Sequence, residues 1–542
     1  MFARAQSKKV MLCMLFLVGF LAYSSIISSF FLSDDFAQIG KVLRGDLSVM
    51  WGREYGGFFR PVFILSYAVD VAIWRRSPLG FHVTNLVLQI FNSCLVWLIA
   101  QSLARESNLN ESQQKSLSVA SGLIFLLHPA HTEAVSWISG RADLLAALGS
   151  LTALLLFINY VRGRGRAYLF AAMFAVALGL LSKEAAICFP LLALLTSLYL
   201  RRSLPVGAAF KQAINLTLPF IVLVALYVAV RAAVLGTLIG GYGAGQHLNV
   251  THGVIISQLL RFSLRLIFPI TLLRHLTFLE SRAMSPILIV TGVIVLIVSA
   301  VALRKPASRS HAIAWGRSNS FPWLLLTLTL AALLPAINLR INIFTTQGER
   351  YLYLASAFFA TAMAYFLIRA ARGNEKLRAA LIVCLLAFYA GSLWLTNRTW
   401  REASMLSRTI LNDVVRQSTR GEILMLNAPD NLRGAYVYRN GFEEALQSFQ
   451  DSKQLRSTGI VAFQDLETRT DEVILQRDAD VLSLRLTTPR TSFYERVAAQ
   501  QPCVTIPDNS GGVLRLRLND CGRAFDIFVV SAGQAVKVGE GP

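Results

Sequence analysis

LLHPAHTEAVSWISGRADLLAA, residues 126–147, places two histidines, a glutamate, an arginine and an aspartate between long apolar segments. Charged side chains are costly at membrane depth, so they are expected to face protein or water and to mark functional sites. We therefore expect this stretch to form a hairpin at one face of a membrane, where it joins two helices that cross it.

The composition indicates a membrane protein. Of the 542 residues, 54% are hydrophobic and 15% are charged, and the mean hydropathy is +0.53. Soluble domains contain roughly 25% charged residues. Many apolar blocks reach the length of about 20 residues that a helix needs to cross the hydrocarbon core. The sequence thus predicts an α-helical polytopic membrane protein.

The apolar blocks predict about eleven transmembrane helices. The first helix follows Lys8 and Lys9, and we expect it to remain uncleaved with its N-terminus in the cytoplasm. The other blocks lie near residues 82–103, 117–137, 142–161, 167–182, 185–200, 213–235, 284–303, 320–338, 351–369 and 378–396. The net charge of +21 comes largely from basic clusters between these blocks, at residues 162–166, 201–211, 304–317 and 369–378. Basic loops mark the cytoplasmic side, so the charge indicates membrane orientation and no nucleic-acid partner.

The chain divides into a transmembrane domain, residues 1–396, and a tail, residues 397–542. An odd number of spans places the tail on the extracytoplasmic side. Its runs VLSLRL and VLRLRL predict a small α/β or mainly β domain. Cys503 and Cys521 lie in this tail and are a candidate disulfide if it is exported. Within residues 236–282, an apolar stretch with Arg261 and Arg265 one turn apart predicts an interfacial helix.

An acidic pair follows the first span. Ser33 or one of the two acids could cap the next helix. Alternatively, Asp34 and Asp35 could hold a divalent cation, or take a proton from an acceptor hydroxyl at the membrane surface. Arg60 begins the next apolar run, where it either snorkels to the interface or binds an anion such as phosphate.

The opening stretch holds His128, His131 and Glu133 in close spacing. A structural zinc site is one interpretation, although only three potential ligands lie nearby and no thiol does. Ordinary polar residues at helix ends are a second. The third is the wall of a water-facing cleft, where Arg141 or a histidine meets a polar ligand. Asp143 could pair with a neighbouring cation.

Two further charged pairs interrupt apolar blocks on the same predicted face: Lys183 with Glu184, and Glu349 with Arg350. Acids, bases and histidines therefore converge on one membrane face from loops that are far apart in sequence. This placement predicts an outward-facing catalytic or binding cleft with basic groups for a phosphate and carboxylates for a hydroxyl. No P-loop or G-x-G-x-x-G motif follows a strand, so a soluble nucleotide donor is not indicated.

Several motifs resemble those of the GT-C superfamily of membrane glycosyltransferases, and especially the transmembrane and tetratricopeptide-repeat and protein O-mannosyltransferase group. They are SDDFAQI, FRPVFILSY, PLGFHVTNLVLQ, HPAHTEAVSWISGRADLLAAL, LLSKEAAI and GERYLYLAS, in this order over roughly residues 30–360. The tetratricopeptide repeats of eukaryotic relatives are missing here, and the 397–542 tail stands in their place.

The resemblance implies a GT-C fold and a polyprenyl-phosphate sugar as donor, with transfer to a hydroxyl on the extracytoplasmic side, usually with inversion. It assigns the role of general base to Asp34 or Asp35, and the family's usual acidic pair favours Asp34, with Asp35 assisting. The donor phosphate would be bound by cations, for which Arg60, Arg141, Lys183 and Arg350 are the candidates. His128, His131, Glu133, Glu184 and Glu349 would line the cleft. A divalent metal is conceivable at the acidic pair but is not expected.

The acceptor is left open, because a protein, a lipid or a glycan would each present a hydroxyl. A bacterial inner membrane is the expected location. A transporter or flippase of a lipid-linked glycan is the main alternative, although transporters place polar groups at mid-membrane rather than on one face. A non-catalytic assembly protein, anchored by its helices and binding a partner through its tail, is the other.

Overall fold

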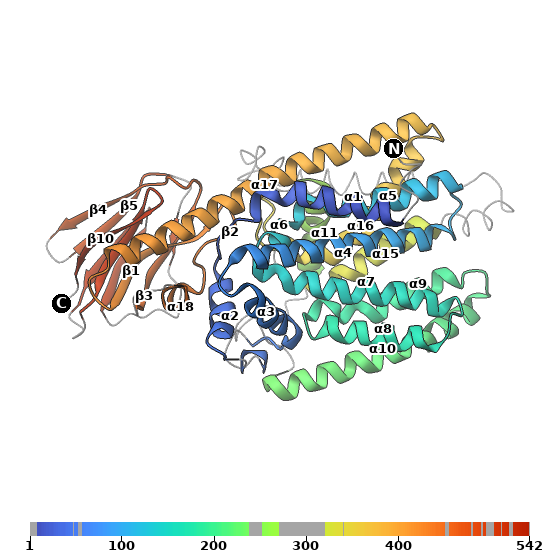
Figure 1. The fold of residues 1–542 in the computed structure, drawn as a ribbon, viewed down its shortest axis with the longest axis horizontal. Helices are drawn as coiled ribbons and strands as arrows, with labels where there is room; N and C mark the ends of the chain where they lie inside the picture. Colours follow the sequence, from blue (N-terminus) through green and yellow to red (C-terminus); the bar gives the residue numbers. More distant parts are fainter. Residues whose placement is uncertain are drawn as a thin grey trace.

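The computed structural model describes residues 8–46, 48–51, 57–237, 252–269, 320–339, 341–449, 455–478, 481–488, 492–494, 503–510, 512–519 and 524–540. A helical bundle and a β-rich domain lie end to end along the long axis of the molecule (Figure 1). The predicted span near 284–303 and the basic loop 304–317 lie outside the described residues.

The bundle consists of apolar helices, as the composition predicts. Within the described residues, six helical segments are long and apolar enough to cross a membrane: Lys8–Ile26, Pro78–Ala104, Ile138–Val161, Val206–Leu235, Glu349–Ala370 and Glu375–Gln417. Shorter apolar segments are Pro61–Trp74, Arg166–Leu180, Glu184–Leu200 and Ser320–Ala336. The chain is therefore a multi-pass membrane protein.

The helices that matter for the site are α1 (Lys8–Tyr23), α2 (Asp34–Leu43), α3 (Pro61–Trp74), α4 (Pro78–Ala104), α5 (Glu111–Leu127), α7 (Arg141–Val161), α8 (Arg166–Leu180), α9 (Phe189–Leu200), α10 (Val206–Leu235), α15 (Ser320–Leu333) and α16 (Tyr353–Ala370). The predicted span 117–137 is wrong at its end, because α5 stops at Leu127. His128 precedes Pro129, and a residue before proline disfavours the helical conformation. Short helical turns η4 (Pro129–His131), α6 (Thr132–Val135) and η5 (Ile138–Gly140) follow.

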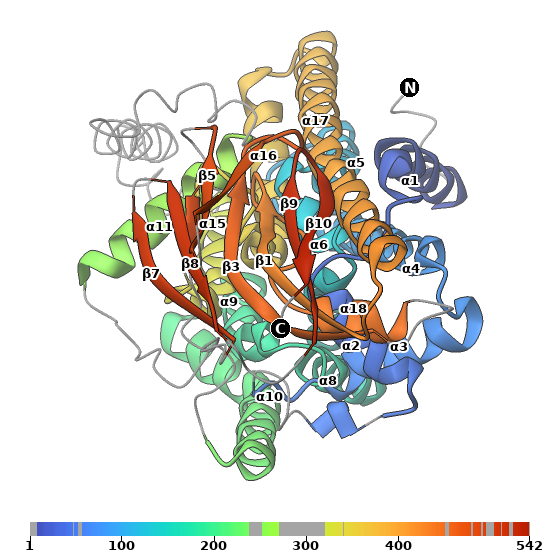
Figure 2. The ribbon, with the colours of Figure 1, turned by 90° about the vertical axis from the view of Figure 1, so that its left-hand side faces the viewer.

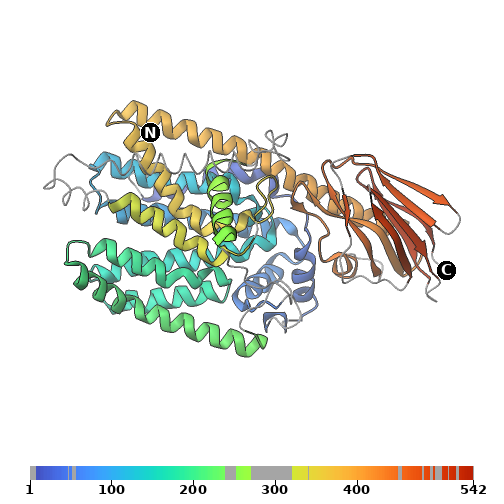
Figure 3. The same cartoon turned by 180° about the vertical axis from the view of Figure 1, so that it is seen from behind.

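The predicted interfacial stretch contains helix α11 (His252–Ile267). It runs across the axes of the neighbouring bundle helices (Figure 3). Arg265 is nevertheless buried, so this part of α11 faces protein.

The C-terminal domain is a β-sandwich, which confirms the predicted β-rich fold. One sheet has the order β10-β9-β1-β3-β6, with β2 paired to β1, and the other has the order β4-β5-β8-β7. The first sheet contains β1 (Glu422–Leu432), β2 (Ala435–Tyr436), β3 (Arg456–Leu466), β6 (Ser492–Tyr494), β9 (Asp526–Ser531) and β10 (Gln534–Glu540). The second contains β4 (Val473–Asp478), β5 (Val481–Leu486), β7 (Val504–Ser510) and β8 (Val513–Leu518). The sheets stack face to face (Figure 2).

Alternation along the strands explains the packing. In β8, Leu514 and Leu516 are buried between the sheets, whereas Arg515 and Arg517 are exposed on the opposite face. Successive side chains of a strand point to opposite faces, so VLRLRL reads as a half-buried strand. Strand β1 is buried on both faces, because α17 (Glu375–Gln417) and α18 (Phe442–Ser448) cover the other side of its sheet.

Helix α17 (Glu375–Gln417) connects the two parts of the chain without a break at residue 397. Its 43 residues correspond to a rod of about 65 Å at about 1.5 Å per residue. One hydrophobic core lies inside the bundle. A second runs from α2 and α3 through Trp137 and Trp400 into the first sheet, so it joins the sandwich to the end of the bundle.

Cys503 is disulfide-bonded. Its predicted partner, Cys521, lies outside the described residues.

Candidate functional site

The stretch 128–141 is a buried hairpin held by amide side chains from α4. Asn85 Nδ2 donates to the carbonyl oxygens of Val135, Trp137 and Ile138 at 3.2, 3.2 and 3.3 Å. A side chain at Gly140 would place its Cβ 2.3 Å from the Glu133 carbonyl oxygen. The hairpin is thus a fixed platform for the charged residues that it carries.

Both histidines form polar contacts that link the hairpin to neighbouring helices. His131 lies between Gln89 and Ser356, with ring nitrogens 3.0 and 2.7 Å from their polar atoms. His128 Nε2 lies 3.1 Å from the Leu266 carbonyl oxygen. Within the described ranges, no three His, Cys, Asp or Glu side chains gather as a metal site would require. The zinc interpretation therefore gains no support from these contacts.

Arg141 is fully buried, and its guanidinium group is occupied. It forms an ion pair with Asp70 at 2.5 Å and donates to Asn85 Oδ1 at 2.7 Å and to the Phe81 carbonyl oxygen at 3.0 Å. It also lies over the Tyr67 ring, 4.9 Å from the centroid. These contacts favour a structural role for Arg141 over the predicted contact with a donor phosphate.

The two acids after the first span have different surroundings. Asp35 is buried, and its oxygens accept from the Ser139 backbone at 2.8 Å, from Ser139 Oγ at 2.5 Å and from the Leu32 backbone at 2.9 Å. Burial raises the pKa of Asp35 to about 7, against the effect of these hydrogen bonds. Asp35 thereby joins the start of α2 to the hairpin.

Asp34 is half-buried and is the more accessible acid of the pair. Its Oδ1 accepts from Asn440 Nδ2 at 2.5 Å and lies 3.5 Å from Ser33 Oγ. Oδ2 has no hydrogen-bond donor within the part of the chain that the structure describes. Ser33 precedes α2 but its side chain does not cap the helix, so the capping interpretation is not supported for Ser33.

Three of the predicted cations form ion pairs with acids from other loops. Arg60 NH2 lies 2.8 Å from Glu184 Oε2, and Lys183 Nζ lies 2.6 Å from each oxygen of Asp143. The backbone N–H of Val62 donates to the Leu181 carbonyl oxygen at 3.1 Å, which brings the start of α3 to the loop after α8. The predicted pairing of Asp143 with a neighbouring cation is confirmed.

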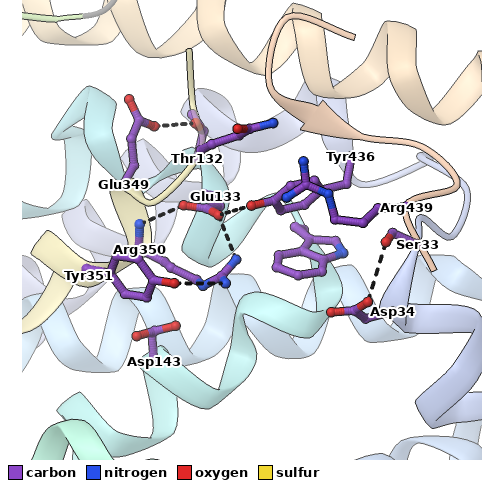
Figure 4. A network of polar contacts seen from close by, with 12 residues as sticks. Ser33, Asp34, Thr132, Glu133, Asp143, Glu349, Arg350, Tyr351, Tyr436 and Arg439 are labelled. Atoms are coloured by element: carbon purple, nitrogen blue, oxygen red, sulfur yellow. Dashed lines mark hydrogen bonds and ion pairs between the residues drawn. The ribbon is translucent and has the colours of Figure 1, made fainter. Parts of the chain in front are cut away.

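The third cation, Arg350, pairs with Glu133. Its NH1 lies 2.6 Å from Glu133 Oε1, and its backbone N–H donates to Oε2 at 2.9 Å (Figure 4). The Tyr351 ring lies between Arg350 and Lys183, whose charged groups are 5.1 and 5.4 Å from its centroid. Two cations and one aromatic ring thus gather beside the hairpin, and the loops that carry them lie together as the sequence predicts.

Glu349, the other acid of that segment, is buried. It pairs with Arg265 of α11 and lies 3.3 Å from Thr132 Oγ1. It contributes to packing between α11 and the hairpin.

Sequence reasoning missed several residues of this cluster: Asp70, Arg231, Arg265, Tyr436, Arg439 and Asn440. Asp70 carries a signal that was available, because an acid inside the apolar run 61–74 requires a buried partner. Tyr436 OH donates to Glu133 Oε1 at 3.0 Å, but it comes from the C-terminal domain. No local pattern predicts that contact.

Comparisons with known proteins identify relatives of part of the chain. Protein O-mannosyl-transferase Tmtc1 of Drosophila melanogaster is 31% identical over 154 residues, which are 28% of this chain and 17% of that protein. Protein O-mannosyl-transferase TMTC1 of Mus musculus is 36% identical over 104 residues, or 19% of this chain and 10% of that protein. The chain thus matches less than a fifth of the length of these relatives.

No protein-family model matches the chain. A solved structure with a weak overall likeness is ArnT from Cupriavidus metallidurans bound to undecaprenyl phosphate. It has 14% sequence identity and a TM-score of 0.37, with 79% of this chain and 84% of that chain covered. The predicted resemblance is confirmed by the sequence relatives: this multi-pass membrane protein is similar, over part of its length, to the transmembrane protein O-mannosyltransferases.

Proposed function

We propose that this protein is a GT-C-type membrane glycosyltransferase that moves a sugar from a polyprenyl-phosphate donor to an acceptor hydroxyl. The names of its relatives suggest a mannose-like hexose as the sugar. The observation that carries the proposal is Asp34, a half-buried carboxylate with one oxygen held by Asn440 and the other without a donor among the described residues.

In this reaction Asp34 acts as the general base. Oδ2 accepts the proton of the acceptor hydroxyl while the hydroxyl oxygen attacks the anomeric carbon. The bond from that carbon to the phosphate oxygen breaks, and polyprenyl phosphate leaves with the bonding electron pair. Attack from the face opposite the leaving group inverts the anomeric carbon. Asp35 does not touch the reactants in this scheme and instead holds Asp34 beside the hairpin.

The departing phosphate needs positive charge more than it needs a proton. Arg350 and Arg60 suit this role for two reasons. Their side chains are 15% and 14% exposed to solvent, so a ligand can reach them. A guanidinium group also presents two donors that match the oxygens of a phosphate. Lys183 supports them at 7% exposure beside Tyr351. Arg141 is left out because it is buried against Asp70.

The orientation of the protein belongs to the same proposal. The end of the bundle that bears the sandwich would face the extracytoplasmic side of a bacterial inner membrane, where lipid-linked sugars meet their acceptors. An oxidising compartment is compatible with the disulfide at Cys503, for which we propose Cys521 as partner.

A transfer assay tests the proposal. Purified full-length protein in nanodiscs is incubated with radiolabelled undecaprenyl-phosphate mannose and three acceptors in separate reactions: a Ser/Thr-rich peptide, a hydroxylated lipid and an oligosaccharide. Transfer to one acceptor, with release of undecaprenyl phosphate, supports the function and names the acceptor class. Movement of intact donor across the bilayer without sugar transfer would instead indicate a flippase.

A further inference from the structure

A segment of the C-terminal domain, residues 433–441 (RGAYVYRNG), lies directly on the acidic pair. The Ser33 backbone N–H donates to the Val437 carbonyl oxygen at 2.8 Å. Ser33 Oγ accepts from the Asn440 backbone N–H at 3.2 Å, and the Asn440 side chain donates to Asp34 at 2.5 Å. Ser33 and the side chain of Asp34 are therefore held by a domain about 400 residues away in sequence.

Aromatic contacts fix the segment in place. Tyr438 stacks on Phe36 of α2 at 5.7 Å between ring centroids, and its OH donates to the Ser407 carbonyl oxygen of α17 at 2.7 Å. The Tyr436 ring lies 4.8 Å from that of Trp137, edge to face. These rings belong to the core shared by the bundle and the sandwich.

The approach is close enough to require glycine. At Gly441, where φ is +81°, an added Cβ would lie 2.5 Å from the Ser33 carbonyl oxygen. Ser33 itself has φ of 48° and ψ of −116°, a conformation that is unfavourable for a residue with a side chain. Such strain persists only where surrounding contacts impose it. Here those contacts come from the C-terminal segment.

We propose that residues 433–441 complete the active site, with Asn440 as the positioning residue that orients the carboxylate of Asp34. This inference rests on the proposed role of Asp34 as general base. The amide of Asn440 binds Oδ1 and directs Oδ2 toward the acceptor hydroxyl.

This assignment gives the C-terminal domain a function in the reaction. A domain that served only as an anchor would need apolar contact with the bundle, and the stacked rings supply it. It would not need a polar side chain on the one half-buried acid of the pair.

The test compares Asn440→Asp and Asn440→Ala with a control, Asn519→Asp. The control makes the same Asn-to-Asp change directly after β8, in the second sheet of the sandwich. Within the sandwich, Asn519 Nδ2 donates to Thr505 Oγ1 at 2.8 Å and its backbone N–H donates to the Cys503 carbonyl oxygen at 2.9 Å. With undecaprenyl-phosphate mannose as probe, both Asn440 variants should lower kcat about tenfold or more, because a misplaced base loses its alignment, with the donor KM unchanged. Asn519→Asp should match wild type.

The pH profile of the reaction distinguishes an Asn440 that orients Asp34 from one that only attaches the C-terminal domain to the bundle. A carboxylate at position 440 faces Asp34, so the acidic limb of kcat/KM in Asn440→Asp should move to higher pH by about one unit or more. If Asn440→Ala does not purify as a monodisperse protein, the isosteric Asn440→Asp decides alone. A wild-type kcat and profile in Asn440→Asp would overturn the inference.

A second measurement needs no donor. Carbodiimide with glycine ethyl ester modifies accessible protonated carboxyls, and peptide mass spectrometry reads the modification of Asp34 against pH. Its midpoint should rise in Asn440→Asp but not in Asn519→Asp. If the midpoint rises but the protein transfers no sugar, the proposed function is contradicted, and the orientation of Asp34 by Asn440 still stands. If the midpoint is unchanged and Asp34→Asn loses transfer, the orientation of Asp34 by Asn440 is refuted, and the proposed function still stands.

Discussion

Replacing the buried Asp70–Arg141 pair separates a structural arginine from one that binds the donor. Asp70→Leu leaves a fully buried guanidinium without its counter-charge at 2.5 Å. Breaking a buried pair on one side typically costs about 3–5 kcal/mol. We therefore expect Asp70→Leu to lower the Tm of the purified protein strongly.

The double variant Asp70→Leu with Arg141→Met removes both charges at similar volume, which is often close to neutral. Part of the cost remains here, because Asn85 Oδ1 and the Phe81 carbonyl oxygen lose their donors at about 1–3 kcal/mol each. The double variant should thus recover part of the Tm of Asp70→Leu.

Activity decides the role of Arg141. Differential scanning fluorimetry in detergent measures Tm, and release of undecaprenyl phosphate measures transfer at a temperature below both midpoints. A structural Arg141 predicts a double variant with kcat/KM within about tenfold of wild type. A double variant that is as stable as wild type but transfers no sugar would refute the structural assignment and restore Arg141 to the donor site.

Three further outcomes are expected. Arg350→Lys should lower kcat/KM for the donor about tenfold or more in the transfer assay, since lysine keeps the charge but loses the fork that binds phosphate at two points; an unchanged value would remove Arg350 from the donor site. Burial and the charge of Asp430 raise the pKa of Asp465 to about 6. The folded state then binds this proton more tightly, so stability falls as pH rises from about 4 to about 6. Asp465→Asn should accordingly raise Tm at pH 7.5 and leave it unchanged near pH 3, and equal Tm values at both pH values would contradict this. Reduction of the disulfide at Cys503 should lower the Tm of the sandwich, by analogy with typical losses of about 2–4 kcal/mol; free thiol at Cys503 in periplasmic material would show that the bond is absent.

Much of the fold follows from local patterns. Long apolar blocks predict the bundle, and the alternation of VLSLRL and VLRLRL predicts strands, because both signals arise from residues close in sequence. The convergence of outer loops was also predictable, since helices of similar length return the chain to the same face. Pairing of Asp143 with Lys183 is one product of that convergence.

The errors have physical causes. The composition changes near residue 397, yet α17 continues to Gln417 because its buried face passes from the bundle core to the sandwich core. Arg141 is a donor-site candidate by resemblance, but its partner Asp70 lies on α3, far away in the sequence, so no local pattern pairs the two.

The contacts of the C-terminal segment were beyond sequence reasoning. Asn440 reaches Asp34 across 406 residues, and Tyr436 reaches Glu133 across 303. Such pairs depend on how the two domains dock, and no motif in residues 433–441 predicts a contact with Asp34.

The most direct test of the account is the rate of sugar transfer in Asp34→Asn, measured in a single turnover with radiolabelled undecaprenyl-phosphate mannose bound to the full-length protein. Asparagine preserves the shape but cannot take the hydroxyl proton, so we expect the rate to fall by about 10²–10⁴-fold with donor binding unchanged. Asp35→Asn is the matched comparison, and it should lower Tm and retain more activity than Asp34→Asn, since the Asp35 carboxylate accepts its hydrogen bonds, within the described residues, from Ser139 and Leu32. Transfer at the wild-type rate by Asp34→Asn would contradict the account.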